Sequence, residues 1–284
     1  GGGGGAEQWV LLNQWFNQYL KGIDQNIPAT PPSTFIVSGD TATFAVKPEA
    51  RDRLVNAEIY FSYDPNSRTR FWNRADAKQS NQSWSVQLPV HADLPLYVFA
   101  MCRYRLTQTV QLEHGETSTF VLNSVEQSIV PDTVDLDALA QFPKSRTVFE
   151  DFSNGIQDWS TRDQRSIKTY KFQSPDLDNS NNKKLALTID PRGKQLSLRL
   201  SASSKFLDQK DNLGDFSYSK LVQGEKPLEV LIDRSEFKSG DDKTLEWSKI
   251  ATFTVTIVDI TTRQTVNLTS KEGQLILQRI KLVD

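Results

Sequence analysis

The sequence predicts an all-β protein of two β-sandwich domains preceded by one short α-helix. From Phe35 onward, most of the 284-residue chain alternates apolar and polar residues with the period of half-buried strands. Residues 7–22 instead follow the three-and-four spacing of one helical face. The length favours two domains, each large enough for a core of its own.

The helix is predicted from "EQWVLLNQWFNQYLKG". Its apolar face contains Trp9, Leu12, Trp15, Phe16, Tyr19 and Leu20. Lys21 and Gly22 supply the cation and the helix-ending residue expected at a C-terminus. The five glycines before the helix are expected to form a flexible lead-in, and "NIPATPP" a stiff linker. We therefore place residues 1–29 outside both sandwiches.

Residues 30–125 are expected to form an immunoglobulin-like or fibronectin-like sandwich. "TFIVSGDTATFAVKP" predicts two strands around a turn at Ser38-Gly39-Asp40. "NAEIYFSYD", "QSWSVQLPV" and "TSTFVLNSV" alternate as half-buried strands, and "PLYVFAMCRYRL" is typical of a central strand.

Residues 126–146 show little strand pattern and are expected to be a linker. Residues 147–284 are expected to form a jelly-roll sandwich of about eight strands. The main strand signals are "KLALTIDP", "QLSLRLSASSKF", "PLEVLIDRSEF", "IATFTVTIVDI" and "GQLILQRIKLV".

Composition argues against several kinds of partner. The formal net charge is −2, so no basic patch for nucleic acid is expected. No apolar run approaches the roughly 20 residues that span a bilayer, so we expect no membrane partner. Cys102 is the one cysteine, which excludes an intrachain disulfide, fits a bacterial protein of any compartment and suggests a buried thiol.

Catalytic signatures are missing from the sequence. His91 and His114 are the two histidines, and both stand in turn-like surroundings where a surface position without a catalytic role is expected. No nucleophile elbow, HExxH motif, Walker loop or dinucleotide fingerprint occurs. Carboxylate pairs such as Glu150-Asp151 could hydrolyse a glycosidic bond if they faced each other across a cleft. An independent enzyme is thus a third interpretation, and the prediction is that the chain is not an enzyme.

The first half resembles part of a known enzyme group. The aromatic helix, the proline linker and residues 59–104 are similar to the end of the catalytic domain and the following β-sandwich of bacterial α/β-hydrolases. This group contains dienelactone-hydrolase-like and PhoPQ-activated pathogenicity-related proteins. The residues that carry the resemblance are Tyr60, Tyr63, Arg70, Phe71, Trp72, Ala75, Trp84, Pro89, Leu96 and Tyr104. It covers about residues 7–110 and implies an upstream α/β-hydrolase domain as partner, with the catalytic residues outside this chain. An exported parent would place the chain in the periplasm or outside the cell.

The second half, about residues 147–284, resembles galactose-binding-like carbohydrate-binding modules. The resemblance is carried by "FEDFSNGIQDWS", "LEWSKIATFTVTIVD" and the closing "GQLILQRIKLVD". It implies a carbohydrate ligand. It also implies a structural calcium, for which Glu150, Asp151 and Asp284 would be the ligands.

Aromatic side chains are the candidate sugar contacts, because sugar rings stack their C–H faces on aromatic rings. Tyr218, in a stretch that reads as a loop, is the foremost candidate. Tyr170 and Trp159 are further candidates, with Arg162 as a hydrogen-bonding neighbour. Each aromatic residue could instead belong to the hydrophobic core. Trp159 stands where such folds bury tryptophan, and Tyr170 could face inward from a strand.

The sequence thus favours a non-catalytic accessory region of a larger bacterial hydrolase, whose second domain binds carbohydrate. The alternative is a structural or oligomerisation module without a small-molecule ligand. At least two exposed aromatic residues in a groove of the second domain would favour glycan binding. Buried aromatic residues would favour a scaffold.

Overall fold

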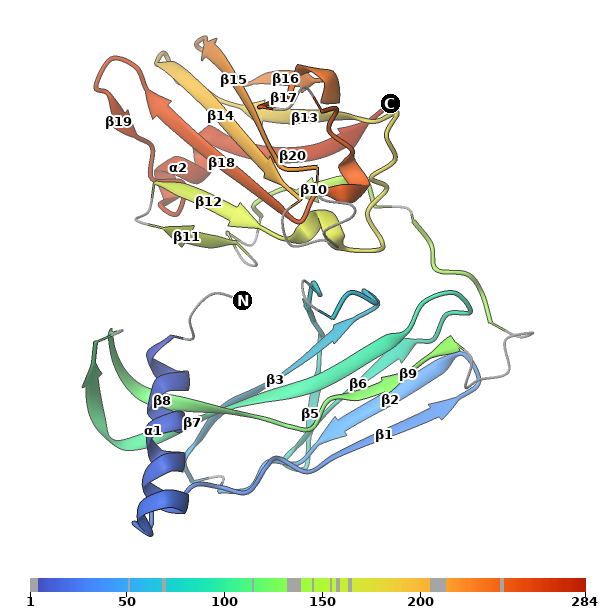
Figure 1. Cartoon of the computed structure of the whole chain (residues 1–284), viewed down its shortest axis with the longest axis vertical. Coiled ribbons are helices and arrows are strands. Elements are labelled where there is room, and N and C mark those ends of the chain that lie inside the picture. Colours follow the sequence, from blue (N-terminus) through green and yellow to red (C-terminus); the bar gives the residue numbers. More distant parts are fainter. Residues whose placement is uncertain are drawn as a thin grey trace. The chain divides into compact units, whose positions relative to one another are not determined.

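The computed structural model divides the chain into two compact units (Figure 1). One unit consists of residues 1–65 and 72–142, and the other of residues 143–284 with the short segment 66–71. The structure describes residues 5–284 apart from 51, 68–69, 114, 132–138, 145, 154, 157–158, 163–164, 205–212 and 241–242, and only the backbone of residue 162. Its antiparallel sheets confirm the prediction of a mainly β, sandwich-like chain with a short N-terminal helix.

The first unit packs two antiparallel sheets around one core. Its elements are α1 (Ala6–Lys21), β1 (Ser33–Ser38), β2 (Thr41–Val46), β3 (Leu54–Ser62), β4 (Asn73–Arg74), β5 (Lys78–Ser80), β6 (Ser83–Pro89), β7 (Leu96–Leu112), β8 (Gly115–Asn123) and β9 (Gln127–Ile129). The strand orders are β1-β2-β6-β5 and β4-β3-β7-β8, with β9 paired to β7. Phe44 of the first sheet and Ile59 and Val98 of the second are fully buried in the same cluster, so the two sheets share one core.

Local signals placed several of these elements correctly. Ser38 pairs with Thr41, which leaves Gly39 and Asp40 as a two-residue turn, and Gly39 takes the positive φ (59°) that glycine tolerates. α1 ends at Gly22, also at positive φ (67°), with its N–H bonded to the Asn17 carbonyl. Both predictions are confirmed.

The first unit extends further than the sequence pattern indicated. Residues 127–129, expected in a linker, form β9, whose Ile129 pairs with Leu96 of β7. Phe142 packs on the rings of Tyr63 and His91, at centroid distances of 4.8 and 4.7 Å. His91 is consequently buried, contrary to the expected surface position, because Phe142 returns from a distant part of the chain to cover it. His114 lies outside the described residues.

The second unit also has two sheets around one core. Its elements are β10 (Val148–Glu150), β11 (Ser160–Arg162), β12 (Ser166–Thr169), η3 (Lys171–Gln173), β13 (Lys184–Ile189), β14 (Gln195–Ser203), β15 (Asp215–Gln223), β16 (Leu228–Ile232), η5 (Arg234–Glu236), β17 (Lys238–Ser239), η6 (Trp247–Lys249), β18 (Thr252–Asp259), β19 (Gln264–Thr265), α2 (Lys271–Ile276) and β20 (Leu277–Val283). One sheet has the order β10-β20-β13-β16. The other, of seven strands, has the order β11-β12-β18-β14-β15-β17, with β19 paired to β18.

Two stretches of this unit differ from the prediction. The segment expected as a loop around Tyr218 is the regular strand β15, and "GQLILQRIKLV" begins with the helix α2 rather than as a strand throughout. α2 starts where Ser270 accepts a hydrogen bond from the N–H of Gly273. A Cβ at Gly273 would lie 2.0 Å from the Asn267 carbonyl oxygen, so only glycine fits this turn.

Candidate functional site

Polar side chains gather on the outer face of the seven-stranded sheet. In β14, Leu198, Leu200 and Ala202 are buried in the core. The residues between them therefore point away from it, because successive side chains of a strand alternate between faces. Register then brings hydroxyl groups of three strands into one row, since Ser201 pairs with Ser217 of β15 and with Thr254 of β18.

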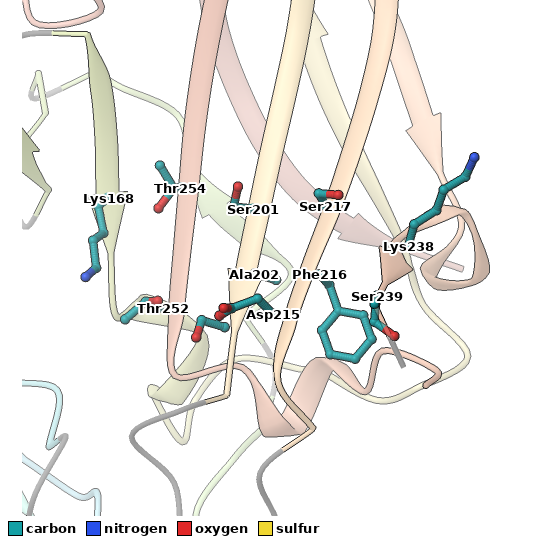
Figure 2. A pocket seen from close by; sticks show the side chains of 12 residues that line it. Lys168, Ser201, Ala202, Asp215, Phe216, Ser217, Lys238, Ser239, Thr252 and Thr254 are labelled. Atoms are coloured by element: carbon teal, nitrogen blue, oxygen red, sulfur yellow. The ribbon is translucent and has the colours of Figure 1, made fainter. Parts of the chain in front are cut away.

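This row lies in an open hollow of about 580 Å³, which we call the polar hollow (Figure 2). The lining comprises Lys168, Ser201, Ala202, Ser203, Asp215, Phe216, Ser217, Lys238, Ser239, Gly240, Thr252 and Thr254. Figure 2 shows Lys168 on one side and Lys238 on the other, with Thr254, Ser201 and Ser217 between them. The lining is thus rich in hydroxyl groups that both donate and accept hydrogen bonds.

A second hollow of about 740 Å³ adjoins the first along β14 and β15. It shares Ser201, Ser217 and Lys238 with the polar hollow, and its other lining residues are Arg199, Leu200, Tyr218, Ser219 and Glu236. Because three residues belong to both, the two hollows form one continuous polar surface, which we call the β14–β15 trough.

The cations at this trough differ in the contacts that they make. Within the described part of the chain, neither Arg199 nor Lys238 forms an ion pair or a side-chain hydrogen bond. Glu236 is the carboxylate of the second hollow, and its Oε1 already accepts the N–H of Asp233 at 2.8 Å. Lys168 lies over the ring of Tyr170, 5.4 Å from its centroid.

The aromatic residues predicted to contact sugar are mostly in the core. Trp159 is buried, and its Nε1 donates to Glu150 at 2.8 Å. Tyr218 is buried against Phe237, with ring centroids 5.6 Å apart. The β15 strand turns its side chain inward; Lys220 and Leu221, both exposed, had obscured the alternation that would have revealed this.

Tyr170 and Arg162 have different positions. Tyr170 is half-buried at the start of η3, not on a continuing strand as expected, and it adjoins the polar hollow through Lys168. Arg162 pairs with Ser166 at the edge of the seven-stranded sheet, and the structure describes its backbone but not its side chain. The exposed pair of stacking aromatics that would have favoured glycan binding is therefore not formed by Trp159 and Tyr218.

The expected calcium ligands are not brought together. Glu150 accepts hydrogen bonds from Lys171 and Trp159, and Asp151 accepts the N–H and hydroxyl of Ser153. Glu150 pairs with Ile280 of β20, four residues before Asp284, which corresponds to roughly 13 Å along the strand. Within the described residues, no cluster of three or more His, Cys, Asp or Glu side chains could hold a metal ion. The predicted calcium site does not fit this geometry.

A second unusual surface lies on α1. Exposed apolar side chains cover one side of the helix, and we call this side the aromatic face of α1. Its residues are Trp9, Leu12, Trp15, Phe16, Tyr19 and Leu20. Trp15 contacts Phe16 and Tyr19, with ring centroids 5.5 and 5.1 Å apart. Tyr19 and Leu20 are 62% and 68% exposed.

The opposite side of α1 holds the helix on its own sheet, largely through polar groups. Glu7 accepts hydrogen bonds from Arg103 of β7 at 2.8 Å and from Thr119 of β8. Val10 is the buried residue of the helix. This orientation is the reverse of that of an ordinary amphipathic helix, whose apolar stripe faces the core. The sequence predicted the stripe, but not that it would point outward.

No protein-family model matches the chain, and no curated protein matches it significantly. Among the described residues, no helix has the length and apolar character needed to cross a membrane.

Proposed function

We propose that the chain is a non-catalytic accessory region whose second unit binds carbohydrate in the β14–β15 trough. The observation that carries this proposal is the row of outward hydroxyl groups from Thr254, Ser201 and Ser217, bordered by lysines. Sugars offer many hydroxyl groups, and serine and threonine can donate to them and accept from them. With Trp159 and Tyr218 buried, the expected recognition relies on hydrogen bonds rather than ring stacking.

The aromatic face of α1 supports the accessory role. A contiguous exposed apolar patch is typical of a surface that another protein covers. The proposed partner is an α/β-hydrolase domain, against which the aromatic face would pack while Glu7 and Arg103 hold the helix to the first unit. In this proposal the partner supplies catalysis and the present chain supplies binding.

A structural module without a ligand is the second candidate. It is favoured by the burial of Trp159, Tyr218 and Trp247, each of which packs within the core of the second unit. In that case the trough would be a hydrated sheet surface, and the aromatic face of α1 would carry the function alone.

Binding to polysaccharides distinguishes these two functions. Affinity electrophoresis of the full chain in gels containing xylan, β-glucan or polygalacturonate is expected to show retardation by at least one of them. Ser201→Leu and Ser217→Leu should abolish it by removing central hydroxyl groups. Thr188→Leu, on the other sheet of the same unit, should not. No retardation by any polysaccharide, or equal retardation of folded Ser201→Leu, would favour the structural module.

The full open reading frame of the gene tests whether the proposed partner domain exists. An open reading frame that encodes an α/β-hydrolase domain ahead of residue 6 would support the accessory role. A reading frame that begins near residue 6 would refute it. Where the domain exists, Trp15→Ser in the full-length protein is expected to loosen its packing, and limited proteolysis between the domains would report this.

A further inference from the structure

We infer that the β14–β15 trough selects acidic polysaccharides, with Arg199 and Lys238 as the groups that bind their anionic substituents. This inference rests on the proposed carbohydrate-binding function and names the class of ligand. It follows from where the cations lie, from what surrounds them and from the chemistry of the guanidinium group.

The two cations border the same hydroxyl row. Arg199 faces outward two residues before Ser201, which is about 7 Å along the strand. Lys238 pairs with Ser217 on the far side of β15. Neighbouring strands lie roughly 4.8 Å apart, so the backbones of Arg199 and Lys238 are about 12 Å apart across the trough. A saccharide bonded to Ser201 and Ser217 would have a cation within side-chain reach at each end.

The described lining of the trough contains more cations than carboxylates. Lys168, Arg199 and Lys238 line the trough, with Asp215 and Glu236 as its carboxylates. Among the described lining residues, three cations thus outnumber two carboxylates, on a chain whose formal net charge is −2. Glu236 is also engaged with the backbone of Asp233 in the capping of η5, so it does not neutralise Arg199 through a contact within ion-pair distance.

Arginine and lysine suit anionic sugars in different ways. The planar guanidinium of Arg199 can donate two parallel hydrogen bonds to one carboxylate or sulfate. The ammonium of Lys238 acts as a point charge with three donors. A neutral sugar would use the hydroxyl row and could accept hydrogen bonds from both side chains, but it has no anion to pair with their charge. An acidic polysaccharide would use both sets of contacts.

The test compares polyanionic and neutral polysaccharides on the full chain. Affinity electrophoresis at fixed ionic strength would use polygalacturonate for carboxylates, dextran sulfate for sulfates and β-glucan as the neutral polymer. We expect at least one acidic polymer to bind about tenfold more tightly than β-glucan, because an anionic acceptor adds charge attraction to the hydrogen bonds from Arg199 and Lys238. The preference between polygalacturonate and dextran sulfate identifies the anionic group.

Variants that each remove one positive charge distinguish binding in the trough from a general attraction between the protein and a polyanion. Arg199→Gln and Lys238→Met are each expected to weaken acidic binding about tenfold and to weaken β-glucan binding by a smaller factor. Lys220→Met removes the same charge from β15 at a position of opposite parity, and acidic binding should remain. An equal loss in Lys220→Met, or none in folded Arg199→Gln and Lys238→Met, would overturn the inference. Equal affinity for neutral and acidic polymers would overturn it while sparing the carbohydrate function, whereas absence of all binding would overturn both.

Discussion

The buried ion pair between Lys171 and Glu150 provides the sharpest test of how the second unit is held together. The two side chains are 10% and 11% exposed. Glu150 also accepts hydrogen bonds from the indole of Trp159 and from the N–H groups of Asp151 and Phe152. Lys171→Met keeps most of the aliphatic stem but removes the ammonium, which leaves a carboxylate without its cation in a nearly dry site.

Removing one partner of a buried pair costs about 3–5 kcal/mol. Glu150 keeps three N–H donors in the variant, so the expected loss in free energy of unfolding is at the lower end, roughly 3 kcal/mol. In a unit of this size that corresponds to a fall of about 9–12 °C in Tm. Adding Glu150→Gln to Lys171→Met should restore part of the loss, because the neutral amide oxygen can still accept from Trp159 without a buried charge.

Differential scanning calorimetry of the full chain measures this loss as a shift of the second unit's transition. The matched control is Lys281→Met, which breaks an ion pair with Glu229 on the same unit at 2.8 Å, with side chains 29% and 41% exposed. Exposed pairs contribute about 0–1 kcal/mol, so this transition should hardly move. If Lys171→Met shifts the transition no further than Lys281→Met, the assignment of a stabilising buried pair is wrong.

Three further outcomes are expected. Tyr218→Phe should leave the free energy of unfolding unchanged or raise it by up to about 1 kcal/mol, because the buried phenol oxygen has no hydrogen-bond partner among the described residues. A loss of glycan affinity in this variant would instead make Tyr218 a ligand contact. Burial acts to raise the pKa of Glu7, but the hydrogen bonds from Arg103 and Thr119 and the charge of Arg103 together outweigh it, and the pKa is lowered from 4.5. The attachment of α1 is therefore present above pH 4.5 and lost as the pH falls below it. Hydrogen exchange of the α1 amides should rise in acid, and less so in Arg103→Gln, whereas unchanged protection would contradict this. Burial lowers the pKa of His91 below 6.5, so the unfolded state binds the proton more readily and the first unit should lose stability as the pH falls below 6.5. Urea titrations at pH 7.5 and 5.5 should show a smaller difference in the free energy of unfolding for His91→Phe than for the unsubstituted protein. An equal difference in the two proteins would contradict the assignment.

Local pattern determined much of the fold. The helix over residues 6–21, its end at Gly22 and the turn at Gly39 follow from side-chain spacing and from conformations that glycine adopts easily. The buried thiol of Cys102 was also predicted from its apolar neighbours, and burial raises its pKa to about 12. These features depend on residues close together in the chain, so the sequence contains the information directly.

Segments with a broken pattern were predicted less well. β15 was missed because Lys220 and Leu221 are both exposed and interrupt its two-residue period. Tyr170 stands at the start of the η3 turn rather than on the strand that the sequence suggested. Burial of Lys171 is stabilised by Glu150, 21 residues earlier, and no local rule reports such a partner.

The sequence by itself determined which residues of each strand share a face, because the side chains of a strand alternate with a period of two. Only the tertiary structure decided which strands are neighbours and in which register. The trough exists because Ser201 of β14 stands beside Ser217 of β15 and Thr254 of β18. The same holds for α1, whose apolar stripe is evident from the sequence, while its outward direction depends on Glu7 meeting Arg103 across 96 residues of chain. Pairing between distant segments is a property of the whole packed core, and the periodicity of a single segment does not encode it.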